Sequence, residues 1–190
     1  PERRAAGSVA AAAPAGPLTS GQAGPARAAA VVKIDNAVGS RPQAGINQAD
    51  VVFELLVEGG ISRFMALFHS EDAAVVGPVR SARTTDLNLL AMLNRPLFAW
   101  SGGNDAVRAA VGAADVVDVG AETTGGTYYR SSGREIPHNL MTSTAALQQA
   151  GGGRGGRVPR PLFGYEPAGA AAPRGAASVE GIQIAVGSTT

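Results

Sequence analysis

The stretch VVFELLVEGGISRFMALFH, at residues 51–69, constrains the fold more than any other part of the chain. It consists of two apolar runs separated by Gly59 and Gly60. Glycine takes the positive φ angles that tight hairpin turns require at little steric cost. The stretch therefore predicts two antiparallel β-strands joined by a two-residue loop.

This hairpin also predicts which side chains share a face of the sheet. With a two-residue loop, Leu56 lies opposite Arg63. Glu54 and Glu58 are then the diagonal neighbours of Arg63 on its own face. Two hypotheses fit this pattern. The three charges form a partly buried ion-pair cluster, or they mark one end of a binding cleft.

The rest of the central region alternates between strand and helix patterns. Short apolar runs bounded by turn residues predict strands, and apolar residues at helical spacing predict helices. The predicted strands cover 28–35, 75–79, 96–100 and 115–121. One predicted helix begins near residue 84, and two others cover 106–113 and 143–150. The alternation predicts an α/β or α+β fold, with a mixed sheet that contains the hairpin and has flanking helices.

Composition divides the chain into segments. Ala, Gly and Pro make up 20 of residues 1–30 and 18 of the 27 residues in 151–177. Such segments lack the large apolar side chains whose burial offsets the entropy of ordering. We therefore expect a flexible tether at 1–27, a folded domain at 28–150, a linker at 151–177, and a truncated small β segment at 178–190.

Charge and residue types exclude several classes of function. The central residues 31–150 carry nine basic side chains against twelve acids, a net charge of −3, whereas the flanks carry seven Arg against three Glu, a net charge of +4. The excess of positive charge therefore lies in the flanks, whereas the central region is net negative. This distribution argues against nucleic-acid binding by the folded region. Cysteine is absent, which excludes disulfides and thiolate chemistry.

Two junctions between a strand and a helix suggest an anion-binding edge. Arg80 and Arg83 lie at the first junction, and Ser101, Gly102 and Gly103 form the second. In open α/β sheets, ligands bind at the carboxyl ends of strands, and guanidinium groups suit bidentate binding of carboxylate or phosphate. The other hypothesis is structural, with one arginine paired with a nearby acid and the other solvated.

Other polar residues extend the list of candidates. His138 lies in a polar loop, which favours a functional role, although a structural hydrogen-bonded histidine is the more common case. His138 and Glu54 are the candidates for moving a proton. Arg41 and Arg63 join the candidates for ligand binding. We expect no metal ion, and Asp35 is the one weak candidate for a metal ligand.

The blocks VEGGISRF and GPVRSAR, followed in order by SGG and HNLMTS, carry a family resemblance. Over residues 28–150 the chain resembles the YerB-like lipoproteins of bacteria, a domain family of unknown function. The resemblance implies an extracytoplasmic domain anchored to the membrane by a lipid on an upstream cysteine, which is not in this chain. It also implies a smaller C-terminal domain that begins at 178–190, and it supplies no catalytic residue.

Three functions remain open from the sequence. The first is a non-enzymatic domain that binds an anionic cell-envelope ligand or a protein partner and needs no cofactor. The second is an envelope phosphotransferase or hydrolase acting on a phosphorylated or pyrophosphate-linked substrate. In that function Arg80 and Arg83 hold the phosphate, Asp35 binds a divalent cation and His138 or Glu54 moves a proton. The third is a scaffold whose charges form ion-pair networks.

Overall fold

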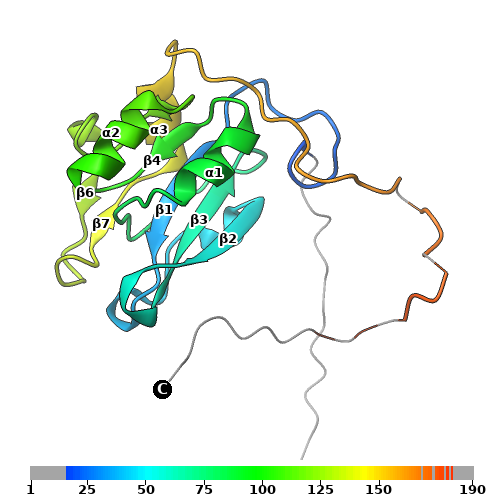
Figure 1. Ribbon diagram of the computed structural model, residues 1–190, viewed down its shortest axis with the longest axis horizontal. Helices are drawn as coiled ribbons and strands as arrows, with labels where there is room; N and C mark the ends of the chain where they lie inside the picture. The colour runs from blue at the N-terminus through cyan, green and yellow to red at the C-terminus, as the bar shows by residue number, and fades with distance from the viewer. Residues whose placement is uncertain (1–15, 168, 173, 178, 180, 182–190) are drawn as a thin grey trace, which may run out of the picture.

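The computed structural model describes residues 16–167, 169–172, 174–177, 179 and 181. The described residues form a five-stranded sheet in the order β2-β3-β1-β4-β5 and a two-stranded sheet of β6 and β7. The strands are β1 (Ala30–Asp35), β2 (Val51–Leu56), β3 (Ser62–Phe68), β4 (Leu97–Ala99), β5 (Val117–Asp118), β6 (Tyr129–Arg130) and β7 (Leu140–Met141). The α-helices are α1 (Asp86–Leu90), α2 (Asp105–Ala113) and α3 (Thr144–Gly151) (Figure 1).

The main sheet is mixed, as the sequence predicts. β1 runs antiparallel to β3 and parallel to β4, so the hairpin and the parallel half meet at β1. β2 is antiparallel to β3, and β5 is parallel to β4. The fold is therefore a mixed α/β arrangement in which the central strand is buried along its whole length.

Helices cover both faces of this sheet. On one face, Val31 and Phe98 pack with Leu90 of α1 and Val107 of α2. On the other face, the core includes Leu147 of α3. Strands buried on both sides are expected to be largely apolar, which accounts for the apolar residues of β4 and of the first half of β1.

The hairpin forms, but its predicted register is wrong by one residue. Leu55, not Leu56, lies opposite Arg63. The last hydrogen bond of the hairpin runs from the Val57 N–H to the Ile61 carbonyl, so the loop has three residues, 58–60, rather than two. Gly59 and Gly60 in this loop have φ angles of 73° and 71°. A slip of one residue moves a side chain to the other face of a strand.

Glu54 therefore does not share a face with Arg63. Instead it lies opposite Phe64, and the ion-pair cluster expected from the two-residue loop does not form.

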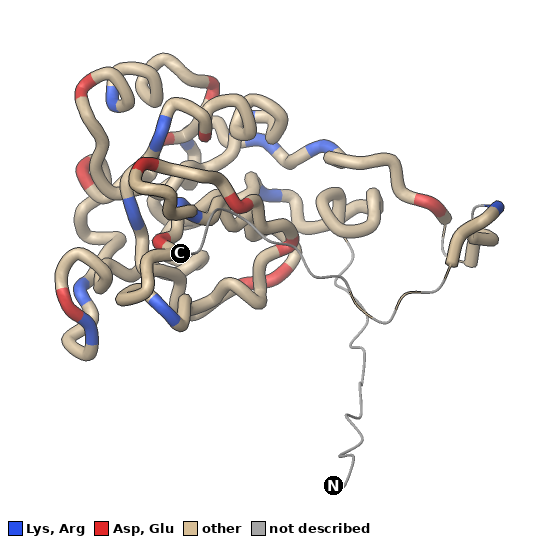
Figure 2. The backbone as a smooth tube through the Cα atoms, turned by 60° about the horizontal axis from the view of Figure 1, so that its bottom comes forward, with Lys and Arg blue, Asp and Glu red and all other residues tan. Residues whose placement is uncertain are grey.

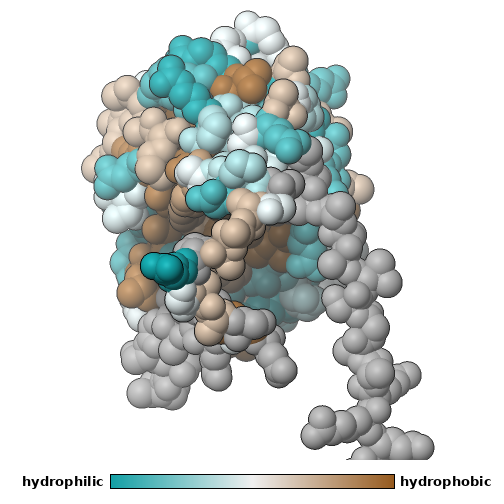
Figure 3. Space-filling model, turned by 90° about the vertical axis from the view of Figure 1, so that its right-hand side faces the viewer, coloured by the Kyte–Doolittle hydropathy of each residue, from teal (hydrophilic) through white to brown (hydrophobic). Residues whose placement is uncertain are grey.

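β2 is the edge strand on the hairpin side of the sheet. Val52 and Leu56 are exposed on it, and Glu54 lies between them. Figure 3, which views the molecule from this side, shows apolar side chains among polar ones around a hollowed centre. A charged side chain in an edge strand disfavours pairing with another strand, so Glu54 protects this edge.

The segment 75–79 differs from the predicted strand. It forms only isolated bridges, in which Val76 pairs with Thr142, Gly77 with Ala44, and Val79 with Ile34. Its backbone therefore connects the end of β1 to the loop before β2 and to the end of β7. This placement brings three separate loops to one end of the sheet.

The helices begin close to the predicted positions. The side chain of Asn104 accepts a hydrogen bond from the Val107 N–H, and that of Ser143 accepts one from the Ala146 N–H. The N-cap of α1 is Thr85, whose side chain makes no capping hydrogen bond, and Asp86 in the first turn instead accepts the N–H of Arg83, which precedes the helix, at 2.8 Å. Asn104 and Ser143 are of the residue types that are preferred at helix N-caps.

Segments outside 28–150 also contact the domain. Leu18 is 2% exposed, and the Leu18 carbonyl accepts a hydrogen bond from the hydroxyl of Tyr165. Arg27 donates to the His69 carbonyl at 2.9 Å. The division of the chain into tether, domain and linker stays a prediction, and most of the expected β segment at 178–190 lies outside the described residues. Within the described part, no helix is both long and apolar enough to cross a membrane.

Candidate functional site

A polar cluster surrounds the carboxyl end of β1. Asp35, the last residue of the strand, is 1% exposed. Its Oδ2 lies 2.7 Å from Nδ1 of His138 and accepts a hydrogen bond from Nε of Arg80 at 3.0 Å. Its Oδ1 accepts the Ala37 N–H at 3.2 Å. One buried carboxylate therefore holds a histidine and an arginine that are distant from it in the sequence.

These contacts change the titration of Asp35. Burial alone would raise the pKa of this carboxyl group, because it removes the charged form from water. The N–H of Ala37, the ring of His138 and the charge of Arg80 outweigh burial, so the pKa of Asp35 lies below its ordinary value. The carboxylate thus stays charged where an ordinary aspartate would begin to take up a proton.

This shift predicts a pH-dependent part of the stability. Unfolded chains protonate Asp35 near its ordinary pKa of about 3.9, before the folded protein does. Its contribution is therefore fully present above that pH and is lost as the pH falls through the lower pKa of the folded state. Free energies of unfolding measured from pH 7 downward should show an advantage over Asp35→Asn that shrinks below about pH 4. Glu71→Gln, at an exposed carboxylate, is the control, and a constant advantage of wild type over Asp35→Asn would contradict the prediction.

Arg63 lies on the strand next to Asp35 and is 5% exposed. Its Nη1 donates to the Ser81 carbonyl at 2.8 Å, while its Nε has no hydrogen-bond partner among the described residues. Burial lowers the pKa of Arg63, and the nearby charges of Arg83 and Arg80 lower it further. Arg63 therefore lies beneath the surface of the cluster and supports the segment that carries Arg80.

The two predicted junctions do lie side by side. The Ser101 N–H donates to the Arg80 carbonyl at 2.9 Å, and the Ala82 N–H donates to the Gly102 carbonyl at 3.1 Å. A pocket of about 360 Å³ lies here, lined by Glu58, Ser81, Arg83, Gly103, Asn104 and Val107. Arg83 and Glu58 both line it and form an ion pair at 2.8 Å. With Arg80 bound to Asp35, both arginines predicted to bind an anion already have a carboxylate partner.

A second pocket lies at the end of the sheet beyond β1. Its volume is about 430 Å³, and it is lined by Gly39, Arg41, Pro42, Gly133, Arg134, Glu135 and His138. The loop after β1 and the loop between β6 and β7 form its walls, at the lower left of Figure 1. We call this cavity the β1-end pocket. It contains His138 and Arg41 from the sequence predictions, together with Arg134, which sequence reasoning missed.

The arginines of the β1-end pocket differ from those at the junctions. Arg41 donates to the side chain and carbonyl of Asn36, both at 3.2 Å. Arg134 donates to the carbonyls of Ser40, at 2.7 Å, and Pro42. Within the described residues, neither guanidinium forms an ion pair with a carboxylate, although Figure 2 shows basic and acidic positions close together over this end. The polar loop around Arg134 was the only signal in the sequence for its role.

Glu54 lies apart from this pocket. Its Oε1 accepts hydrogen bonds from the Asn36 side chain, at 3.2 Å, and from the Ser62 hydroxyl. The described residues contain no group of three or more acidic, histidine or cysteine side chains that could hold a metal ion. Oδ1 of Asp35 is bound to the Ala37 N–H, and Oδ2 is bound to Arg80 and lies next to His138. With both oxygens occupied in this way, Asp35 is poorly placed to bind a cation.

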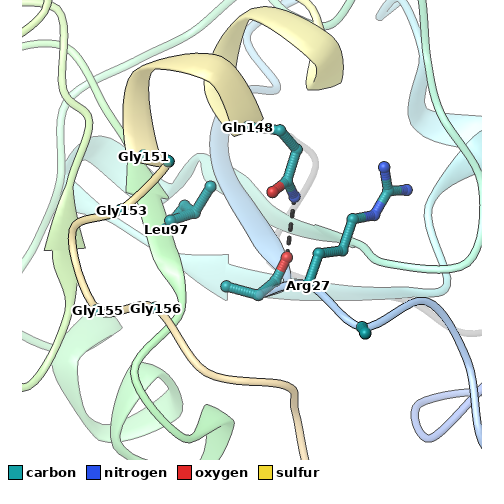
Figure 4. A pocket seen from close by; sticks show the side chains of 10 residues that line it. Arg27, Leu97, Gln148, Gly151, Gly153, Gly155 and Gly156 are labelled. Atoms are coloured by element: carbon teal, nitrogen blue, oxygen red, sulfur yellow. Dashed lines mark hydrogen bonds between the residues drawn. The ribbon is translucent and has the colours of Figure 1, made fainter.

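A third cavity, of about 440 Å³, lies next to α3 and is lined largely by glycine backbone (Figure 4). Its long polar side chains are already bound. Gln148 donates to the Ala28 carbonyl at 2.9 Å, and Arg27 pairs with Asp72 at 3.0 Å. This cavity offers fewer free polar groups than the β1-end pocket does.

The fold and the pocket define a mixed α/β domain with a histidine-containing and arginine-lined cavity at one end of its sheet. The chain belongs to the family described as "Protein of unknown function (DUF3048) N-terminal domain", whose model matches residues 15–157. This confirms the family resemblance predicted from the sequence, and the family description assigns no activity.

Two comparisons place the chain within this family. It is 36% identical over 121 residues to a Bacillus subtilis protein named "Putative lipoprotein YerB", covering 63% of this chain and 36% of that protein. It is also similar to the crystal structure of the YerB protein from Bacillus subtilis, with a TM-score of 0.65 and 29% identity. That match covers 71% of this chain and 47% of the crystallised chain. The chain thus spans between a third and a half of the relatives it matches.

Proposed function

We propose that the domain binds an anionic ligand in the β1-end pocket. The observation that carries the proposal is the contrast between two pairs of arginines. Arg80 and Arg83 are paired with carboxylates, whereas Arg41 and Arg134 line a cavity without a carboxylate partner among the described residues. A guanidinium without a counter-ion in a concave site is suited to carboxylate or phosphate.

The size and charge of the pocket support a small ligand. A volume of about 430 Å³ falls within the range of small-molecule sites. Glu135 is the one acidic side chain in the lining, so the two arginines leave the pocket with positive charge. Both guanidiniums are oriented by hydrogen bonds to backbone or amide oxygens, which reduces the entropy lost on binding.

Calorimetric titration with inorganic phosphate tests the proposal. We expect wild-type protein to bind and the double variant Arg41→Gln/Arg134→Gln to lose at least about tenfold in affinity, because each charged hydrogen bond contributes roughly 1.5–3 kcal/mol. The affinity should also fall as salt is added, since the attraction is electrostatic.

Arg83→Gln is the matched control. It removes one positive charge from the junction pocket, where the double variant removes two from the β1-end pocket, and should leave phosphate affinity unchanged. If Arg83→Gln weakens binding and the double variant does not, the ligand occupies the junction predicted from the sequence and the β1-end pocket is the wrong site. Melting temperatures of all variants separate loss of binding from loss of folding.

A second candidate function is transfer or hydrolysis of a phosphate group, and the contact between Asp35 and His138 favours it. Asp35 lies 2.7 Å from Nδ1, which orients the ring, and the described residues provide no hydrogen-bond partner for Nε2. In such a reaction an attacking hydroxyl forms the new P–O bond and gives its proton to Nε2 as the bond to the leaving oxygen breaks. Turnover of p-nitrophenyl phosphate that is lost in His138→Gln, but not in Glu54→Gln, would support this function.

The name of the Bacillus relative supports a location outside the cytoplasm. We propose that this domain is held at the outer face of a membrane by a lipid on a cysteine upstream of these residues. Its ligand would then come from the cell envelope. Labelling of the full-length protein with a radioactive fatty acid tests the anchor.

A further inference from the structure

We propose that the ligand of the β1-end pocket is an amphiphile, a phosphate monoester that carries a hydrocarbon chain. The phosphate lies between Arg41 and Arg134, and the chain lies against Val38 and Ile136. This inference rests on the proposed anion binding and adds the chemical class of the ligand.

The apolar rim of the pocket carries the inference. Val38 is 85% exposed and Ile136 is 71% exposed, and these are the two most exposed large hydrophobic side chains of the described residues. Single exposed apolar residues are common on proteins. Here the two extremes lie on the two loops that form the walls of one charged pocket.

The neighbouring residues connect these side chains to the pocket. Val38 precedes Gly39, and Ile136 follows Glu135, and both of those neighbours line the cavity. The loops are in direct contact, because a Cβ atom on Gly39 would lie 3.3 Å from Cδ2 of His138. Arg134 joins the same loops through the Ser40 carbonyl. Val38 and Ile136 thus each directly adjoin a lining residue, one on each of the two loops that form the pocket.

This arrangement matches both ends of an amphiphile. The guanidiniums provide charged hydrogen bonds for a phosphate head, and a hydrocarbon chain leaving the pocket removes the exposed valine and isoleucine from water. A free phosphate ion would use the arginines alone and leave the apolar rim in water. The rim thus favours a phosphate with a chain over one without.

The experiment compares inorganic phosphate with hexyl phosphate, which is a soluble monoester, by calorimetric titration of the full chain. We expect hexyl phosphate to bind about tenfold more tightly, as burial of roughly two methylene groups would give. In Val38→Ser/Ile136→Ser the two affinities should become equal, with phosphate affinity unchanged. Both positions are exposed, so the variant should fold normally.

Met92→Ser is the control, because Met92 is also exposed but lies in the turn directly after α1, which contributes no residue to the pocket. It should keep the preference for hexyl phosphate. Equal affinities in wild type would overturn this inference while leaving anion binding intact. If Val38→Ser/Ile136→Ser still prefers hexyl phosphate to inorganic phosphate, the hydrocarbon chain does not lie against these two side chains. Failure of both ligands to bind would overturn the proposed function as well.

Discussion

Replacing Asp86 with asparagine is expected to lower the free energy of unfolding by about 3–5 kcal/mol, because the change leaves a buried lysine without a counter-ion. Lys33 is the only lysine of the chain, and it lies in the central strand. Both side chains of the pair are 0% exposed, and Nζ of Lys33 lies 2.7 Å from Oδ1 of Asp86. Asparagine preserves the shape of Asp86 and can still accept the Arg83 N–H, but its single oxygen leaves no acceptor for Lys33, so the change removes both the charge and the hydrogen bond of the pair.

Urea denaturation measures this effect, and the double variant Lys33→Met/Asp86→Asn is the control. Removing both charges should restore more than half of the lost stability, since a buried ion pair is often replaceable by apolar groups. Burial lowers the pKa of Lys33, and Asp86 opposes that shift. In Asp86→Asn the folded protein should therefore release the proton at lower pH than the unfolded chain, and stability should rise with pH up to about 10.4. A loss below about 1 kcal/mol at neutral pH would show that the pair is not the main support of this core.

Replacing Gly45 with alanine is expected to cost about 2–4 kcal/mol, from a positive φ angle and a clash together. Gly45 has φ 75°, and a Cβ atom there would lie 2.3 Å from the Val75 carbonyl oxygen. The oxygen belongs to the backbone, so a side chain cannot rotate away to make room. The neighbouring Ala44 pairs with Gly77, and the change should therefore displace the loop that carries Arg41.

Gly59→Ala is the matched control for this experiment. Gly59 has a similar φ angle of 73°, but a Cβ atom there would have no neighbour within 4 Å. Gly59→Ala should lower the free energy of unfolding by only about 1 kcal/mol, which is the cost of an alanine in the left-handed conformation. The difference between the two melting temperatures isolates the close approach at Gly45. Equal losses would mean that the 41–45 loop moves freely enough to absorb the added methyl group.

The order of elements could be predicted because their signals are local. Apolar runs bounded by turn residues predict β1 and β4, and apolar residues at helical spacing predict α2 and α3. The hairpin was also predictable, but its register was not. Two consecutive glycines permit loops of two or three residues, and only the ladder between β2 and β3 decides between them.

The candidate site was less predictable because it joins residues that are distant along the chain. The sequence brought Asp35, Arg80 and His138 together only in the enzyme hypothesis, with Asp35 as a cation ligand, and nothing local indicates that this carboxylate instead holds the other two side chains. Arg83 was predicted to bind a ligand, yet it faces Glu58 across 25 positions of sequence. Whether an arginine is free or paired depends on which carboxylates the tertiary structure brings within reach.

The sequence by itself determined the class of fold, the family and the types of charged residue available, because strand and helix periods, caps and motif order are properties of neighbouring residues. Only the tertiary structure decided which arginines are paired with carboxylates and which line a cavity. It also buried the single lysine against Asp86, a contact across 53 positions. Ion pairs form between groups a few ångströms apart in space, and the folding of the whole chain sets those distances.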